Sequence, residues 1–212
     1  VAGCITSTGL ASKLLRAIVS ASGGVMIIAL LLTMICCIVL GMGVPTTATY
    51  CIMAATCAPI LMSPEIGVEM LAAHFFVFYF GIVADITPPV ALAAYAGAAI
   101  AKAGPMKTAF NASRLAIAAF IVPYIIAMNP AMLFINTTIQ EVVMITITSI
   151  IGIFGVAAGL SGFVFRNMKW WERILCIVGG LTLLVPGSLT DLIGLVLVGA
   201  VCVLGYQAAK KE

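Results

Sequence analysis

The sequence predicts an all-α polytopic membrane protein. Of its 212 residues, 64% are hydrophobic and 8% are charged, whereas a soluble globular domain carries roughly 25% charged residues. The mean hydropathy is +1.27, and the apolar residues form long runs that short polar or basic stretches divide. Too few charges are present to cover a water-soluble fold of this size, so soluble classes are excluded.

Two regions are expected: a permease region, residues 1–135, and a C-terminal membrane extension, residues 136–212. Residues 1–9 resemble the end of a membrane segment. The chain has no initial Met and no basic leader with a cleavage site, so we expect a piece of a longer polypeptide.

Residues 10–22 are predicted to form an amphipathic helix that lies along the membrane interface. Its leucine, isoleucine and valine residues fall on one helical face, and Lys13 and Arg16 fall on the other. Gly23-Gly24 ends the helix.

Residues 25–61 contain two apolar limbs that meet at Gly41-Met42-Gly43-Val44-Pro45-Thr46-Thr47. The first limb, 25–40, spans roughly 24 Å as a helix, which is shorter than a hydrocarbon core of about 30 Å. A re-entrant hairpin that enters and leaves on one side is therefore favoured. A single tilted helix with a kink is the alternative.

Residues 69–101 are predicted to be one spanning helix that is broken at Asp85-Ile86-Thr87-Pro88-Pro89. Its second half repeats small residues at Ala93, Gly97 and Ala101, a pattern typical of close helix packing. We expect a basic loop at 102–114, followed by a span at 115–128 that can kink at Pro123.

Residues 142–164 are predicted to be a full span with a glycine-rich packing face. A basic loop at 166–173 follows, and then two short apolar segments, 174–185 and 192–206. The positive-inside rule places the basic stretches 102–114, 166–173 and 210–211 in the cytoplasm. Because basic residues gather at segment ends, no nucleic-acid partner is expected.

The first break has the composition of a cation site. Gly41 and Gly43 permit unusual backbone angles, and Pro45 frees a carbonyl group one turn earlier. Thr46 and Thr47 add hydroxyl oxygens, and such a neutral oxygen cage suits sodium. The N-terminus of the following helix can receive a carboxylate. A ligand-free hinge is the alternative.

The second break places a carboxylate inside a membrane segment. Asp85 is the only acidic residue between Glu69 and Lys102, and a carboxylate at that depth marks a functional site by default. Thr87 adds a hydroxyl group, and Pro88 keeps the backbone open. Asp85 therefore binds sodium or carries a proton, or it only caps the next helix. The expected substrate-binding residues are Thr47, Thr49 and Thr87.

No catalytic or transition-metal motif is present. The sequence lacks GxSxG and HExxH motifs, it has one histidine, and its seven cysteines form no CxxC pair. We therefore expect no enzyme and no transition-metal site. Besides a transporter, a non-transporting membrane scaffold or assembly subunit is compatible with the breaks.

Three stretches in order resemble the large membrane subunit of tripartite ATP-independent periplasmic (TRAP) transporters. They are GMGVPTTATY, AAHFFVFYFGIVADITPPVALAAYAGAAIA and FIVPYIIAMNPAML. The chain looks most like the second inverted repeat of fused permeases that work with TAXI-type solute receptors, and residues 142–206 resemble their C-terminal extension.

The resemblance implies half of an elevator-type transporter in a bacterial or archaeal cytoplasmic membrane. It implies sodium-driven import of organic anions, such as carboxylates, delivered by a periplasmic binding protein. The partners would be that TAXI-type protein, the missing N-terminal half and membrane lipid. In the family, ions bind where hairpin tips meet unwound helices, here Gly41, Gly43, Pro45, Thr46 and Thr47 with Asp85, Thr87 and Pro88. Proton coupling on the same architecture stays open.

Overall fold

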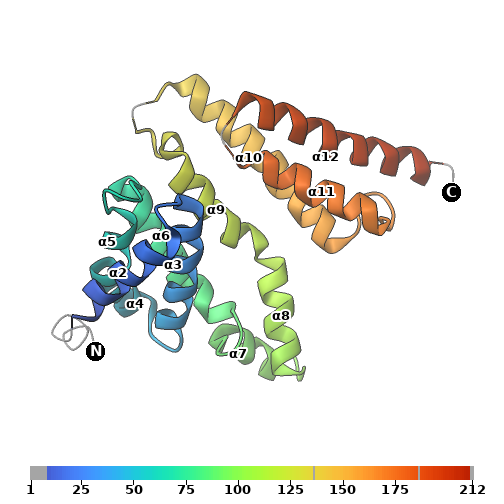
Figure 1. Cartoon of the computed structure of the whole chain (residues 1–212). Helices are drawn as coiled ribbons and strands as arrows, with labels where there is room; N and C mark the ends of the chain where they lie inside the picture. Colours follow the sequence, from blue (N-terminus) through green and yellow to red (C-terminus); the bar gives the residue numbers. More distant parts are fainter. Residues whose placement is uncertain (1–8, 136, 186, 211–212) are drawn as a thin grey trace. The chain divides into compact units, whose positions relative to one another are not determined.

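The computed structural model describes residues 9–135, 137–185 and 187–210, and these residues are helical without a β-strand (Figure 1). The prediction of an all-α polytopic membrane protein is confirmed. Two helices, Ile139–Ser161 and Leu189–Gln207, are long and apolar enough to cross a membrane. The bent pair Pro105–Leu115 and Ile117–Met128 makes a third span if it is counted as one.

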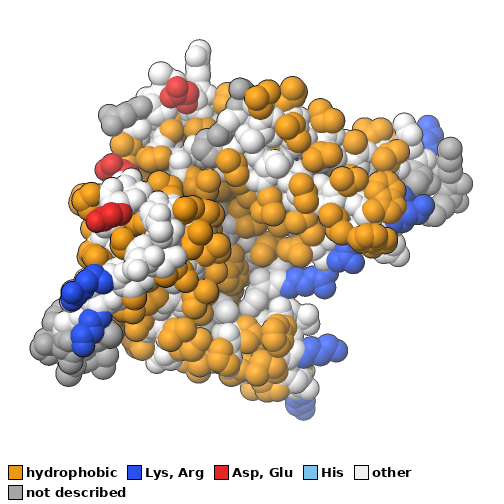
Figure 2. All heavy atoms as spheres, viewed as in Figure 1, with side chains coloured by type: hydrophobic (Ala, Val, Ile, Leu, Met, Phe, Trp, Pro, Cys, Tyr) orange, Lys and Arg blue, Asp and Glu red, His pale blue; other side chains and the backbone are white. Residues whose placement is uncertain are grey.

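Hydrophobic side chains cover most of the visible surface, and lysine and arginine side chains form a few separate groups on it (Figure 2). Large apolar residues such as Val39, Ile150 and Val196 are more than half exposed. A surface of this kind is stable in lipid, where exposed apolar side chains carry no penalty.

The chain folds as two compact units, Val1–Ala127 and Met128–Glu212. The sequence predicts the boundary between the two regions after residue 135. The structure places it after Ala127, eight residues earlier. The expected end of a membrane segment at residues 1–9 lies, except for Gly9, outside the described residues.

Unit 1 begins with α2 (Leu10–Ser22), which Gly23 ends in a left-handed conformation at φ 58°. Ile18 and Ser22 of this helix are buried, whereas Lys13 and Arg16 are exposed. The helix is therefore amphipathic in the structure as in the sequence.

Residues 25–61 fold as an antiparallel helical hairpin rather than one kinked rod (Figure 1). The first limb is α3 (Met26–Gly41), and the second is α4 (Thr46–Thr56) with the short α5 (Ala58–Leu61). The Cys36 and Cys57 sulfur atoms of the two limbs lie 3.8 Å apart. A Cβ added at Gly24 would lie 3.9 Å from the Glu65 carbonyl oxygen, so the two ends of the hairpin are adjacent.

The broken helix consists of α6 (Met70–Val83), the 3₁₀ turn η1 (Ala84–Ile86) and α7 (Leu92–Ile100). Phe76 and Phe80 of α6 are fully buried and form edge-on ring contacts with Tyr124, at centroid distances of 5.2 and 5.8 Å. These rings form the centre of the unit 1 core.

The predicted basic loop at 102–114 is wrong, because α8 (Pro105–Leu115) occupies most of it. Pro105 stands at the first helical turn, where its missing N–H costs nothing. The following α9 (Ile117–Met128) continues through Pro123 without a break. The 42° bend between α8 and α9 lies at Ala116, whose ψ of 19° leaves the helical range.

The predicted packing face of α7 is shifted by one residue. Ala93, Gly97 and Ala101 are exposed, whereas Ala94 and Ala98 are buried. Alanine is present on both faces of this helix, and its pairing with Ala109 of α8 decides which face is covered.

Unit 2 is a bundle of α10 (Ile139–Ser161), α11 (Trp170–Thr182) and α12 (Ser188–Ala209). The glycine face of α10 packs on α11 as predicted: a Cβ at Gly159 would lie 2.8 Å from the Arg173 carbonyl oxygen. The last apolar segment is longer than predicted, because the helix already begins at Ser188 and the Asp191 N–H donates to the Gly187 carbonyl oxygen.

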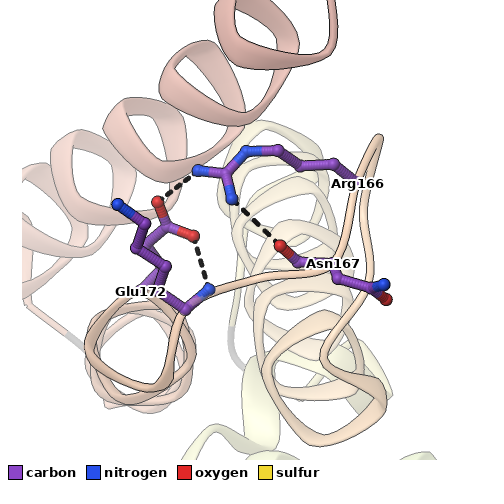
Figure 3. Close-up of polar contacts among 4 residues, drawn as sticks. Arg166, Asn167 and Glu172 are labelled. Atoms are coloured by element: carbon purple, nitrogen blue, oxygen red, sulfur yellow. Dashed lines mark hydrogen bonds and ion pairs between the residues drawn. The ribbon is translucent and has the colours of Figure 1, made fainter. Parts of the chain in front are cut away.

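An ion pair between a buried carboxylate and a half-buried guanidinium joins the turn before α11 to its first helical residues (Figure 3). Arg166 Nη2 lies 2.6 Å from Glu172 Oε1, and the Lys169 N–H donates to Glu172 Oε2 at 2.8 Å. Arg166 Nη1 donates to the Asn167 carbonyl oxygen at 2.9 Å. Residues 170–173 of the expected basic loop are thus the first turn of α11, and the turn before them is an ordered cap.

Candidate functional site

The hairpin tip and the helix break lie against each other within unit 1. A Cβ added at Gly41 would lie 3.0 Å from Ala84 Cβ and 3.3 Å from the Gly81 carbonyl oxygen. Only a residue without a side chain allows the end of α3 to approach the end of α6 so closely. Two segments that are far apart in sequence therefore form one region.

The tip itself is a short turn. Gly43 has a φ of 73°, which favours glycine, and the Val44 N–H donates to the Gly41 carbonyl oxygen at 3.4 Å. Pro45 then starts α4, which has no side-chain cap. The first N–H groups of α4 are therefore not used by a capping side chain.

The threonines of the tip have different positions. Thr49 is buried, and its hydroxyl group donates to the Val44 carbonyl oxygen at 3.1 Å. Thr46 and Thr47, like Gly43 and Pro45, are exposed. The structure brings Gly41 and Thr49 to the helix break, while the other predicted tip residues face outward.

The second break is held open by hydroxyl groups. The Thr87 hydroxyl donates to the Val83 carbonyl oxygen at 2.6 Å, and the Thr87 N–H donates to the Ala84 carbonyl oxygen at 3.2 Å. Ser113 of α8 donates to the Ile86 carbonyl oxygen at 2.9 Å. Several carbonyl oxygens freed by the break thus already accept one hydrogen bond, and each keeps a second lone pair.

Asp85 lies in the 3₁₀ turn and is half-buried, one residue after Ala84. Within the described part of the chain, its carboxylate has no hydrogen-bond or ion-pair partner. Thr87 and Pro88 follow it and are half-buried as well. The helix break therefore carries one carboxylate and several peptide oxygens, and Asp85 directly follows Ala84, the residue nearest to Gly41 of the hairpin tip.

Two residues of the break were missed by the sequence analysis. The Tyr95 hydroxyl donates to the Pro89 carbonyl oxygen, and Ser113 binds the Ile86 carbonyl oxygen. Neither has a local sequence signal, because each acts on a backbone group that only the fold brings near. Ser113 also falls within the stretch that the sequence indicates as a loop.

A second polar contact joins the hairpin to the broken helix. Tyr50 Oη of α4 lies 3.0 Å from His74 Nδ1 of α6, and the Tyr50 ring packs edge-on against Phe78. The only histidine of the sequence is therefore a packing residue with a hydrogen-bond partner. Among the described residues, no group of three histidine, cysteine or acidic side chains is placed to hold a metal ion.

Comparison with known protein families identifies both regions. The model for the DctM component of the tripartite ATP-independent periplasmic transporters matches residues 1–141. A domain of unknown function, DUF3394, matches residues 142–196. No curated protein and no solved structure matches the chain.

The first match covers well over half of the chain and includes the hairpin and the broken helix. It confirms the resemblance to the large TRAP permease subunit and, with it, a multi-pass setting in a membrane and work with a periplasmic binding protein. This chain belongs to the DctM family and is a permease component of a TRAP transporter.

Proposed function

We propose that this chain is the permease part of a sodium-coupled secondary transporter. It imports organic anions, above all carboxylates, that a periplasmic TAXI-type solute-binding protein hands over. The observation that carries the proposal is the contact between Gly41 and Ala84, because it joins the hairpin tip to the helix break that bears Asp85.

Sodium binds beside this contact. The Asp85 carboxylate supplies the one negative charge, and peptide oxygens of both breaks complete the oxygen ligands. Irregular backbone at membrane depth occurs where it lines a protein-enclosed site, and paired broken helices are a common source of such sites.

The substrate carboxylate binds at the start of α4. Thr46 and Thr47 stand at its first turn, and the helix has no side-chain cap to compete for its N–H groups. The positive end of the helix dipole adds to the attraction. The exposure of these threonines suits a site that a second repeat of the permease completes.

Transport proceeds by an elevator-type movement in a bacterial or archaeal inner membrane. A second repeat of the permease supplies the opposing hairpin and the rest of the scaffold. Support for this step is the pairing of a helical hairpin with a broken helix inside one compact unit.

The test is uptake of a labelled carboxylate into liposomes that contain the full permease, with its solute-binding protein outside and an imposed sodium gradient. Asp85→Ala is expected to raise the half-saturating sodium concentration about 10- to 100-fold, because one contact to a charged group contributes roughly 1.5–3 kcal/mol. Thr46→Ala with Thr47→Ala is expected to raise the KM for substrate.

The matched controls lie in unit 2. Asp191→Ala removes a carboxylate from the first turn of α12, and Thr146→Ala with Thr148→Ala removes two hydroxyls that bind their own helix. Both should leave sodium dependence unchanged. Unaltered sodium dependence in Asp85→Ala would refute the site. Uptake driven by a pH gradient without sodium would instead favour proton transfer by Asp85, and no uptake under any gradient would favour a scaffold.

A further inference from the structure

An open apolar groove of about 660 Å³ lies in unit 1 between the helix break and the α8–α9 pair. Pro88 and Pro89 form one wall, and Met106, Phe110, Ile117 and Phe120 form the other. Phe110 is 62% exposed and Met106 is 48% exposed. The volume falls within the range of roughly 300–1,000 Å³ that is usual for ligand sites.

The polar groups of this groove are already occupied. Thr87 donates its hydroxyl to the Val83 carbonyl oxygen, and Ser113 donates to the carbonyl oxygens of Ile86 and Ala109. Among the described residues, no charged side chain lines the groove. Its walls therefore suit a hydrocarbon chain better than a carboxylate substrate.

Two lysines are next to or close to the groove residue Met106 in the sequence. Lys107 follows the groove residue Met106, and Lys102 lies in the turn that joins α7 to α8; both are exposed. Figure 2 shows basic side chains beside hydrophobic surface at this end of unit 1. The sequence contains no acidic residue between Asp85 and Glu141, so no local carboxylate of this segment opposes these charges.

Lys102 occupies a position that normally favours glycine. Its φ is 52°, the Ala103 N–H donates to the Ala98 carbonyl oxygen at 2.9 Å, and the Lys102 N–H donates to the Ala99 carbonyl oxygen at 3.3 Å. This is the Schellman ending of a helix, with lysine at its left-handed residue. The backbone of this turn would accept glycine at position 102, so the lysine side chain is not needed to form the turn.

We propose that this corner binds an anionic phospholipid of the cytoplasmic leaflet. The headgroup phosphate lies between Lys102 and Lys107, and one acyl chain lies in the groove against Pro88 and Pro89. An acyl chain gains little by leaving bulk lipid, because both surroundings are apolar. The preference for this lipid therefore comes from the two lysines, each of which raises affinity about fivefold.

The proposal depends on the membrane setting that the family match shows, and on the cytoplasmic placement of the basic stretch that the positive-inside rule predicts. It does not depend on sodium coupling. Its test therefore measures lipid binding rather than transport.

The experiment uses fluorescence quenching of the full chain in phosphatidylcholine vesicles. Trp170 and Trp171 are changed to phenylalanine, and Phe110→Trp places the only tryptophan in the groove. A small fraction of phosphatidylglycerol with brominated acyl chains is compared with the same fraction of brominated phosphatidylcholine. Brominated phosphatidylglycerol is expected to quench the tryptophan introduced at position 110 with an apparent affinity about 25-fold higher, from two lysines at about fivefold each.

One double variant and one matched position make the result decisive. Lys102→Gly with Lys107→Gln should make the apparent affinities for the two brominated lipids equal. Glycine at position 102 suits the left-handed backbone, so loss of folding is not expected. Phe154→Trp in α10, at a side chain that is 48% exposed, should be quenched equally by both lipids.

Equal quenching of the groove tryptophan by both lipids, with Lys102 and Lys107 intact, would overturn the proposal. Such a result would mean that protein fills the groove or that only bulk lipid touches it. Displacement of phosphatidylglycerol by soluble glycerol phosphate would also overturn it, because the site would then bind a free phosphate group.

Discussion

At the scale of single residues, unit 2 depends on a buried charge that the sequence pattern does not reveal. Glu172 is 3% exposed and accepts from both the Arg166 guanidinium and the Lys169 N–H. The carboxylate thereby satisfies the start of α11 and neutralises a cation within the fold. Removal of one partner from such a pair leaves the other charge desolvated.

Glu172→Gln is therefore expected to lower the free energy of unfolding by about 3 kcal/mol. Thermal unfolding in detergent measures the loss, and Glu69→Gln, at an exposed carboxylate without a capping hydrogen bond, should change it by less than about 0.5 kcal/mol. Replacing both Arg166 and Glu172 by Met should recover most of the stability. A double variant that is less stable than Glu172→Gln would contradict this account.

Lys102, in contrast to Glu172, is a residue whose replacement is expected to stabilise the fold. Lys102→Gly removes a side chain from a left-handed conformation and is expected to stabilise unit 1 by about 1 kcal/mol. The unfolding midpoint in detergent should rise, in contrast to Lys107→Gly, which places glycine inside α8 and should lower it. A lower midpoint for Lys102→Gly would show that its side chain contributes contacts beyond its charge.

At the scale of helices, both units rely on glycine where two backbones meet. A Cβ at Gly180 would lie 2.6 Å from the Gly152 carbonyl oxygen and 2.8 Å from the Val156 nitrogen. Backbone atoms cannot move aside as a flexible side chain does. The distance between α10 and α11 is therefore set by the absence of side chains on the facing residues.

Gly180→Ala is accordingly expected to destabilise unit 2 by about 1–3 kcal/mol, the range for overpacked interiors. Gly199→Ala in α12 is the matched control, because an added Cβ there meets nothing within 4 Å. That control should be neutral or stabilising, since glycine is a poor helix former. Equal effects of the two substitutions in thermal unfolding would rule out close packing as the cause.

The contact between hairpin and helix break permits a similar test of function. Gly41→Ala would place a methyl group 3.0 Å from Ala84 Cβ and 3.3 Å from the Gly81 carbonyl oxygen, and we expect it to weaken sodium-dependent uptake by about tenfold and to lower the unfolding midpoint. Gly97→Ala on the open face of α7 should change neither. Normal sodium dependence in Gly41→Ala liposomes would show that the two breaks tolerate separation.

At the scale of the whole molecule, the chain divides into two compact units at residues 127 and 128, which is 14 residues before the boundary between the two family matches. Units with separate cores need not unfold together. We therefore expect Glu172→Gln to accelerate hydrogen exchange in α10–α12 and to leave α3 and α6 unchanged. Faster exchange in all of these helices would show that the whole chain unfolds as one cooperative body.

The amino-acid composition was sufficient to predict the class of fold, and glycine and proline residues predicted the positions of most helix ends. Gly23 ends α2, Pro45 starts α4, and the break after Val83 lies where the DITPP segment stands. Errors arose where local signals are weak: the stretch at 102–114 contains charges and small residues but is amphipathic enough to be a helix. The site was predicted only as two separate breaks, because sequence spacing carries no information about Gly41 meeting Ala84.

The sequence by itself determined that this protein resides in a membrane, since its few charges cannot cover a water-exposed surface, and that two helices must break, since glycine and proline interrupt them. Only the tertiary structure decided which oxygen atoms remain available and which side chains meet. Thr49, Thr87 and Ser113 use their hydroxyl groups to satisfy backbone carbonyls, whereas Asp85 lies half-buried in the 3₁₀ turn that follows α6. The physical reason is that hydrogen bonds and close contacts form between segments distant in sequence, and their energies depend on distances that no local pattern contains.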